Sequence, residues 1–307
     1  MKGFTDICRM TQPEVKEYMK KYLKSKFYDV ICEDGFLYAK GDVPVLLVAH
    51  MDTVHKEKCG EIMQLGGRIS SPQGIGGDDR CGIFIIANIV KELHCSVLLC
   101  EDEEIGGVGA RKFAQTDYIK NLGVNYMIEF DRKGNNDAVF YHCDNQDFIN
   151  FVLDSTGFKE ANGTYSDIST LMEPSKLCAV NLSSGYYNAH TKNEYVVYDE
   201  MFDTIAAAKG LIKEECTEPF KYVKKEYKYT PTKTYNTPVQ TSMFDKKNII
   251  DRIADDTHLE LEVVYIGYGD VEKVAYGMGE TKAECWLDVM TQNPWLCLAR
   301  VVDYSFM

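Results

Sequence analysis

Residues 43–54 of the chain, VPVLLVAHMDTV, begin with a run of apolar side chains and end with a histidine and an aspartate. An apolar run of this length is typical of a β-strand that is covered on both faces, as in parallel sheets. A second run, Cys95–Cys100, leads directly into four acidic residues, Glu101–Glu104. Because ligands of open α/β sheets bind at the carboxyl ends of the strands, we expect the chemistry of this protein to begin where these runs end.

Outward from these two runs, strand and helix patterns alternate through residues 1–216. The expected strands are Phe27–Cys32, Phe36–Ala39, Val43–Ala49, Cys95–Cys100, Val124–Phe130, Ala138–His142 and Leu177–Leu182. The expected helices are Thr11–Phe27, Arg80–Leu93, Val108–Ala114, Phe148–Leu153, Asp167–Leu171 and Glu200–Ile212. Such alternation predicts a layered α/β domain.

The alternation of strand and helix patterns ends after Cys216, where the composition of the chain changes. Residues 217–242 contain a run of Lys, Tyr and Thr broken by prolines. Basic residues among aromatics also occur in proteins that bind single-stranded nucleic acid, but acidic residues surround this run and an extended connection fits it better. Residues 243–307 predict a small α+β module, which we expect to pack on the first domain or on another subunit. The alternative is a plain extension of the catalytic sheet. The expected elements of residues 243–307 are the helices Lys246–Ala254 and Lys282–Thr291 and the strands Leu259–Tyr268 and Cys297–Tyr304.

The composition predicts a cytoplasmic protein. The formal net charge of −13 among 307 residues argues against a nucleic-acid partner, because phosphate binding needs a basic face. The first residues lack the basic and apolar regions of a signal peptide, and the apolar runs are too short to span a membrane. The 11 cysteines form no CxxC pair, which predicts reduced thiols that pack as small apolar side chains.

Five short motifs place histidine or acidic residues after the expected strands. They are AHMDTV with His50 and Asp52, GIGGDDRCGI with Asp78, LLCEDEEIGGVGA with Glu103 and Glu104, MIEFDRKG with Asp131, and SSGYYNAHTKNEY with His190. Each has a plainer explanation when taken alone: a hydrogen-bonded histidine, a helix cap or a solvated acidic loop. Together they predict a metal site, because clustered carboxylates need a cation to offset their repulsion. Mixed imidazole and carboxylate ligands suit zinc or a similar divalent ion.

The stretch Val43–Leu211 resembles the clan of co-catalytic zinc exopeptidases that includes peptidase T, carboxypeptidase G, and the leucyl and glutamyl aminopeptidases. The motifs HMDTV, GGDDRCGI and DEEIGGVGA carry the resemblance, in this order. It implies a three-layer α/β/α fold with a mixed central sheet. It also implies a site for two divalent ions, namely zinc, with cobalt or manganese as alternatives.

The resemblance also implies a role for each residue of the motifs. Five residues are metal ligands: His50 and Asp131 for one ion, Glu104 and His190 for the other, and Asp78 as a bridge between them. Glu103 is the general base, and Asp52 orients His50.

Two departures from the peptidase T-like pattern matter. Arg132 and Lys133 follow Asp131 where that group usually has glycines. The spacing between Asp131 and His190 is also too short for the lid domain that peptidase T-like enzymes insert there. This spacing and the motif YSDISTL resemble the leucyl and glutamyl aminopeptidases instead. We therefore expect a lidless catalytic domain, and an oligomer, if one forms, through the C-terminal module.

Three functions remain open from the sequence. The first is an aminopeptidase that hydrolyses short peptides. The second is a carboxypeptidase or an N-acyl amino acid deacylase that uses the same metal site. The third is a binding protein without catalysis, against which the retention of every ligand and of Glu103 argues. Arg80, Arg132 and Lys133 do not decide between a pocket for a free amine and one for a carboxylate.

Overall fold

The structure, a computed structural model, describes residues 1–225, 259–266, 272–279, 289 and 300–306. The chain divides into two compact units, Met1–Lys228 and Tyr229–Met307. Among the described residues, none of the helices combines the length and the apolar character that a membrane span needs.

The first unit is built on an eight-stranded sheet with the order β1-β2-β6-β3-β7-β10-β8-β9. Strands β3, β6, β7 and β10 run parallel, whereas β2 and β8 pair antiparallel with β6 and β10. The sheet is therefore mixed, with a parallel centre. Its strands are β1 (Val30–Glu33), β2 (Phe36–Ala39), β3 (Val43–His50), β6 (Cys95–Cys100), β7 (Tyr126–Arg132), β8 (Asp137–Val139), β9 (Lys159–Ala161) and β10 (Ala179–Ser183).

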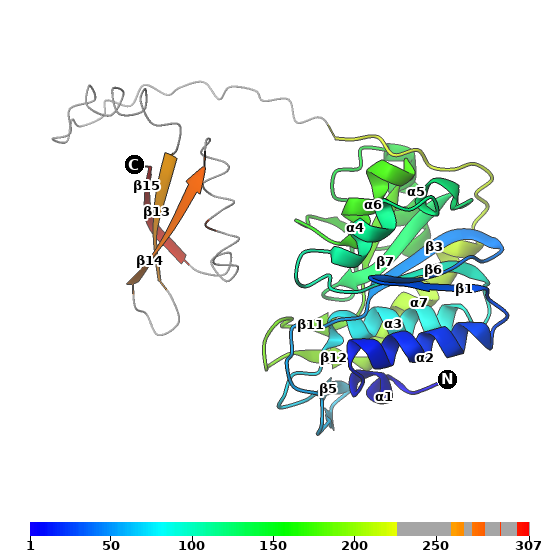
Figure 1. Cartoon of the computed structure of the whole chain (residues 1–307), viewed down its shortest axis with the longest axis horizontal. Coiled ribbons are helices and arrows are strands. Elements are labelled where there is room, and N and C mark those ends of the chain that lie inside the picture. Colours follow the sequence, from blue (N-terminus) through cyan, green and yellow to red (C-terminus); the bar gives the residue numbers. More distant parts are fainter. Residues whose placement is uncertain (226–258, 267–271, 280–288, 290–299, 307) are drawn as a thin grey trace. The chain divides into compact units, whose positions relative to one another are not determined.

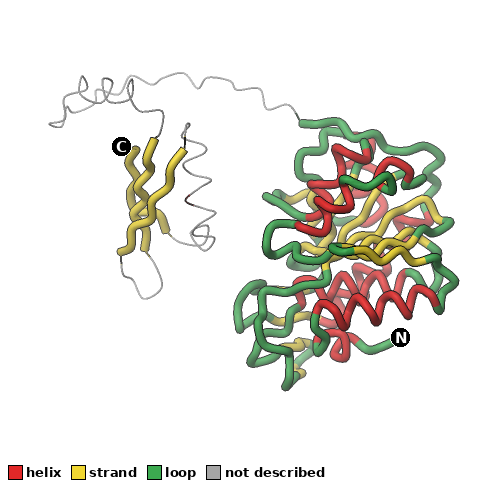
Figure 2. The backbone as a smooth tube through the Cα atoms, viewed as in Figure 1, coloured by secondary structure: helices red, strands yellow, loops and turns green. Residues whose placement is uncertain are grey.

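Helices cover both faces of this sheet (Figure 1, Figure 2). One face carries α1 (Phe4–Cys8), α2 (Gln12–Lys24), α3 (Gly77–Ile89) and α7 (Tyr198–Lys213). The other face carries α4 (Val108–Ala114) and α6 (Asp167–Ser175), which pack against each other. Helix α5 (Gln146–Thr156) packs against α7. A short 3-10 helix spans Ile119–Asn121. The three-layer α/β/α fold with a mixed central sheet is thereby confirmed.

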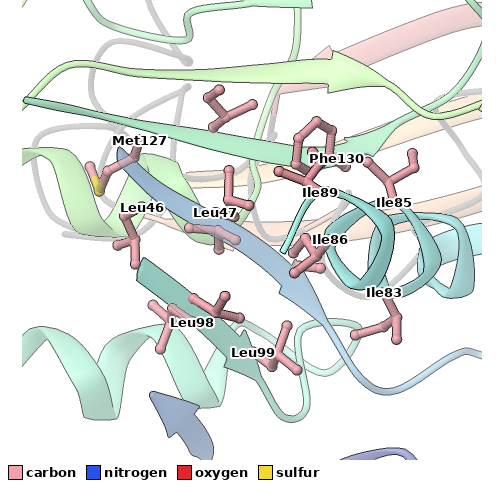
Figure 3. Close-up of a cluster of buried hydrophobic side chains, with 14 of the residues drawn as sticks. Leu46, Leu47, Ile83, Ile85, Ile86, Ile89, Leu98, Leu99, Met127 and Phe130 are labelled. Carbon is pink, nitrogen blue, oxygen red and sulfur yellow. The ribbon is translucent and has the colours of Figure 1, made fainter. Parts of the chain in front are cut away.

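Helix α3 anchors the core beneath the candidate site. Every residue of α3 is buried, as expected for a helix that is apolar on all sides. Its isoleucines, among them Ile83 and Ile86, pack near Leu47 and Leu99 of the central strands (Figure 3). Each such side chain contributes roughly 1.5–3 kcal/mol on burial. This packing fixes the start of α3, which carries the paired aspartates.

A second, smaller sheet was not predicted. Its order is β11-β12-β5-β4, formed by β11 (Tyr186–Tyr187), β12 (Tyr195–Val197), β5 (Arg68–Ser70) and β4 (Met63–Leu65). Strands of two or three residues have no periodicity to recognise, so the sequence pattern could not reveal them. This sheet joins β4 and β5, which follow β3 in the chain, to the segment that contains His190.

The second unit contains a three-stranded antiparallel sheet with the order β14-β13-β15. Its strands are β13 (Leu259–Ile266), β14 (Glu272–Gly279) and β15 (Arg300–Phe306). Both expected strands are present, as β13 and β15 with shifted bounds, but β14 was not predicted, because its glycines are untypical of a strand. The expected helices Lys246–Ala254 and Lys282–Thr291 lie outside the described residues, apart from the helical Val289.

The start of the expected connection, residues 217–225, belongs to the first unit. Lys221 and Lys224 form bridges with Leu177 and Cys143, and the Phe220 ring packs against Phe148 at 5.2 Å. These contacts tie the segment to the sheet. Residues 226–242 of the connection lie outside the described residues.

Candidate metal centre

The parallel centre of the sheet brings four of the five motifs to one edge. His50 is the last residue of β3, Glu101–Glu104 follow β6, and Asp131 lies near the end of β7. The chain after β10 continues through β11 to His190. Because the four strands run parallel, their carboxyl ends meet at the same edge. Asp78, at the start of α3, completes the group.

His50, Asp78 and Asp131 form a buried triad. His50 is 0% exposed, and its Nε2 lies 3.0 Å from Asp78 Oδ1 and 3.6 Å from Asp131 Oδ1. The Tyr186 hydroxyl donates to Asp131 Oδ1 at 3.2 Å. The Asn181 side chain holds the main chain of Asp131 in both directions, at 2.9 and 3.0 Å. We call this group the buried triad.

Asp78, Glu104 and His190 form a second triad. His190 Nε2 lies 3.1 Å from Asp78 Oδ2 and 3.1 Å from Glu104 Oε2. The His190 side chain is 56% exposed, whereas that of Glu104 is 8% exposed. We call this group the open triad. It shares Asp78 with the buried triad, one carboxylate oxygen pointing toward each histidine.

The residues fit divalent ions on their chemistry and their burial. In each triad the ligand atoms lie within 4.8 Å of one another. Glu104 Oε1 is buried and has no hydrogen-bond partner among the described residues. An unpaired buried carboxylate oxygen is costly unless a cation contacts it. Both triads combine imidazole with carboxylate, the mixture that zinc accepts.

The pKa values record the crowding of acids at this edge. Burial and the neighbouring Asp78 raise the pKa of Asp131 to about 7. Hydrogen bonds to Asp78 and Glu104 raise the pKa of His190 to about 11. Burial lowers the pKa of His50, but hydrogen bonds to Asp131, Asp52 and Asp78 outweigh it and hold the value well above its usual range. Without ions, protons on these groups must balance the negative charge.

Asp52 connects the histidine of the buried triad to the acidic loop. His50 Nδ1 lies 3.1 Å from Asp52 Oδ1. The same carboxylate accepts hydrogen bonds from the main-chain N–H groups of Glu103 and Glu104, at 3.0 and 3.1 Å. A carboxylate in this place fixes both the tautomer of the histidine and the position of the loop.

Glu103 lies at the site but outside both triads. Its side chain forms no hydrogen bond or ion pair with another of the described residues. Burial raises the pKa of Glu103 to about 8. The charges of Asp131 and Glu104 add to this rise, and the charge of His50 opposes it. Of the two adjacent acids, the structure thus places Glu104 against His190 and leaves the Glu103 side chain without a hydrogen-bond partner among the described residues.

The loop at the start of α3, residues 74–79, is held by a contact with β3, and Asp78 and Asp79 within it have non-helical main-chain angles. Asp79 is 0% exposed, and its carboxylate accepts from the N–H groups of His50 at 3.2 Å and Gly82 at 2.8 Å. The peptide bond between Asp78 and Asp79 is cis. The second aspartate of the motif therefore supports the loop that presents the first.

Sequence reasoning missed two residues of the site, Tyr186 and Glu194. Both lie within the quoted motif SSGYYNAHTKNEY, four residues before and four after His190. Glu194 is 0% exposed and lies 2.8 Å from His55, so His55 has a buried partner. The charge of Glu194 was the available signal, but its burial depends on contacts that only the fold reveals.

Two of the three cations that the sequence left undecided, Arg80 and Arg132, have partners in the structure. Arg80 is buried and donates to the main-chain oxygens of Met51 and Met10, the latter at 3.0 Å. Arg132 forms two hydrogen bonds with Asp137, at 3.1 and 2.9 Å. Lys133 is exposed. Arg80 is thus held by the main chain and Arg132 by an acidic side chain of the same unit.

No family model and no curated protein sequence matches the chain. Solved structures with the same fold do match. Aminopeptidase PepT of Bacillus cereus aligns with a TM-score of 0.57 at 14% identity, over 68% of this chain and 96% of that one. A tripeptidase of Staphylococcus aureus aligns with a TM-score of 0.56 at 12% identity, over 68% and 96%. An aminopeptidase of the archaeon Desulfurococcus kamchatkensis aligns with a TM-score of 0.53 at 14% identity, over 69% and 94%.

The first unit therefore has the fold of these peptidases, and the fold implied by the sequence resemblance is confirmed. The segment between Asp131 and His190, all of which is described, contains β8, α5, β9, α6 and β10. Strands β8 and β10 belong to the central sheet. Every element of that segment belongs to the same compact unit as the central sheet.

Proposed function

We propose that this protein is a two-metal exopeptidase that removes N-terminal residues from short peptides. The observation that carries the proposal is the pair of triads that share Asp78. A carboxylate with one oxygen toward each histidine is placed to bridge two ions. His50 and Asp131 would hold one ion, and Glu104 and His190 the other.

A pair of zinc ions would lower the pKa of a water molecule and polarise the scissile carbonyl. Glu103, beside both triads, takes a proton from the water and delivers it to the leaving amine. Its raised pKa of about 8 suits a group that must gain and lose a proton near neutral pH. Asp52 keeps His50 in the required tautomer and holds the main chain of Glu103 in place.

The charges around the site favour a substrate with a free amine. Five acids close to the triads are not metal ligands in this scheme: Asp52, Asp79, Glu103, Glu129 and Asp167. Both oxygens of the buried Asp167 carboxylate have no hydrogen-bond partner among the described residues, and burial together with Glu103 raises its pKa to about 7. Arg80 donates to main-chain oxygens and Arg132 pairs with Asp137, so the described surroundings of the triads present acids rather than an unpaired arginine to the end of a substrate, which favours a free amine over a carboxylate.

The test is a panel of di- and tripeptides with free, N-acylated or C-amidated ends, incubated with zinc-loaded protein. We expect cleavage of the free and C-amidated peptides and none of the N-acylated ones. Preferential cleavage of N-acyl amino acids would assign the site to a deacylase. Loss of cleavage when the C-terminus is amidated would assign it to a carboxypeptidase. Glu103→Gln protein serves as the control for contaminating peptidases.

A further inference from the structure

Glu194 is a buried carboxylate that the proposed reaction does not use. It lies four residues after His190, directly before β12, and is 0% exposed. Its own N–H donates to the main-chain oxygen of Thr191 at 3.2 Å, which joins it to the turn that carries His190. A buried carboxylate costs stability unless partners compensate it, so its partners indicate its role.

Three groups contact the Glu194 carboxylate, and two of them belong to the loop at the start of α3. Oε1 accepts a hydrogen bond from the N–H of Asp78 at 3.0 Å, and Oε2 accepts one from the N–H of Gly76 at 2.9 Å. His55 Nε2 lies 2.8 Å from Oε2. One carboxylate therefore holds the main chain on both sides of Gly77, including the residue that the two triads share.

The loop approaches Glu194 as closely as glycine allows. A Cβ atom on Gly77 would lie 2.6 Å from Val196 Cγ2 and 3.3 Å from Glu194 Oε1. A Cβ atom on Gly74, whose φ is +93°, would lie 2.2 Å from the His55 ring. Neither position has room for a side chain. The glycines of the motif let the main chain reach the carboxylate and the imidazole.

His190 itself needs such support. Its φ of +64° lies in the left-handed region, which only a few per cent of residues other than glycine adopt, although histidine does so more often than most. Its side chain is more than half exposed, so side-chain packing holds it only in part. A turn in this conformation persists when surrounding contacts hold it. Glu194 lies at the end of this turn and connects it to Gly76 and Asp78.

We propose that Glu194 is a positioning residue for the metal centre, which ties the Asp78 loop to the His190 turn and so sets the geometry of both triads. His55 supports the carboxylate from its other side. The proposal rests on the proposed function, because positioning is needed only if the triads bind metal. Removing a group that orients metal ligands typically weakens metal binding by about 10–100-fold.

The test compares Glu194→Gln with wild-type full-length protein. In the variant, an NH2 group must face an N–H donor of Gly76 or Asp78, so at least one hydrogen bond is lost. We expect zinc affinity, measured by competition with a chromophoric chelator, to fall about 10–100-fold. Amide hydrogen exchange of metal-free protein should accelerate in residues 74–80, while β3 and β6 keep their protection.

The matched control is Glu200→Gln. Glu200 also accepts two hydrogen bonds, from the Tyr187 hydroxyl at 2.8 Å and from Asn135 at 3.1 Å, but it contacts neither triad. We expect its zinc affinity and exchange pattern to match wild type. If Glu194→Gln does not fold, His55→Gln tests the same claim, with a smaller loss of affinity and faster exchange in residues 74–80.

The outcomes separate the two proposals. Wild-type protein that binds zinc together with a variant of equal affinity and equal exchange would overturn the positioning role alone. Faster exchange spread evenly over β3, β6 and residues 74–80 would also overturn it, because it would show a general loss of stability. Wild-type protein that takes up no zinc would remove the proposed function, and the positioning role with it.

Discussion

The two triads of the metal centre differ in how the fold supports them. The buried triad contains His50, which is 0% exposed and lies at the end of a central strand. The open triad contains His190, whose side chain is 56% exposed on a turn between two short strands. The sheet thus builds one half of the site into its core and leaves the other half facing solvent.

The two triads therefore differ in how much they contribute to the stability of the fold and in how open they are to solvent. The buried half has its orienting groups, Asp52 and Tyr186, in direct contact with its ligands. The open half relies on a turn and on the loop that Glu194 holds. The exposed half faces solvent, so we expect substitutions there to affect catalysis more than folding, and the reverse in the buried half.

The largest expected effect separates the two adjacent glutamates beside the open triad. Glu103→Gln should lower peptidase activity by about 10²–10⁴-fold with zinc content unchanged, because it removes only proton transfer. Glu104→Gln should lose activity together with zinc from the open triad. Activity assays paired with metal analysis of the dialysed proteins decide this. If Glu103→Gln loses zinc and Glu104→Gln keeps it, the two roles are exchanged.

The two histidines should differ in stability. His50→Ala removes a buried group that contacts three carboxylates, and should lower the free energy of unfolding of the metal-free protein by about 3 kcal/mol. His190→Ala should lower it by less than about 1 kcal/mol, because exposed ion pairs contribute little. Urea denaturation at pH 7 measures both. Equal losses would mean that the triads do not differ in burial in solution.

Zinc affinity should rise steeply with pH. Below pH 7 the metal-free protein holds a proton on Asp131, whose pKa is raised to about 7, and His190 keeps its proton up to about pH 11. An ion must displace these protons, so the bound state carries fewer of them and binding strengthens as pH increases. We expect at least about a tenfold gain per pH unit between pH 6 and 8. Titrations at constant ionic strength that show a flat profile would contradict the protonation of these ligands.

The smallest expected effect concerns Tyr186. Tyr186→Phe removes one hydrogen bond to Asp131 and should cost about 1 kcal/mol of zinc binding, a change of roughly fivefold, in the buried triad only. Tyr187→Phe is the control, since the Tyr187 hydroxyl bonds to Glu200 instead. A loss of affinity in Tyr187→Phe as large as in Tyr186→Phe would show that the hydroxyl contact to Asp131 has no specific role.

Much of the first unit was predictable from local patterns. The bounds of Cys95–Cys100 and Val108–Ala114 match β6 and α4, because an apolar run and a short amphipathic segment are bounded by charges and glycines. Helix α3 is assigned from Gly77, three residues before the expected Arg80, but Asp78 and Asp79 within it have non-helical main-chain angles, and it ends at Ile89 rather than Leu93. The four-stranded sheet and β14 were missed, since short or glycine-containing strands carry no clear period.

The residues of the site also differ in how far the sequence could predict them. His50 and Asp131 follow long buried strands, so local pattern and strand direction were enough to place them at one edge. The separate roles of Glu103 and Glu104 came from family resemblance, because two adjacent acids in one run cannot be told apart by composition. Glu194 could not be predicted, since its partners Gly76 and Asp78 are more than a hundred residues away in the sequence.

The number of zinc ions bound by Asp78→Asn protein tests the central claim most directly, because both triads depend on this carboxylate. Wild-type protein, loaded with zinc and dialysed, should retain two ions per chain, and His50→Ala and His190→Ala should retain about one each. Asp78→Asn should retain neither ion at the same free zinc concentration while keeping its circular dichroism spectrum. A folded Asp78→Asn protein that still holds two ions would contradict the shared bridge on which the proposed function rests.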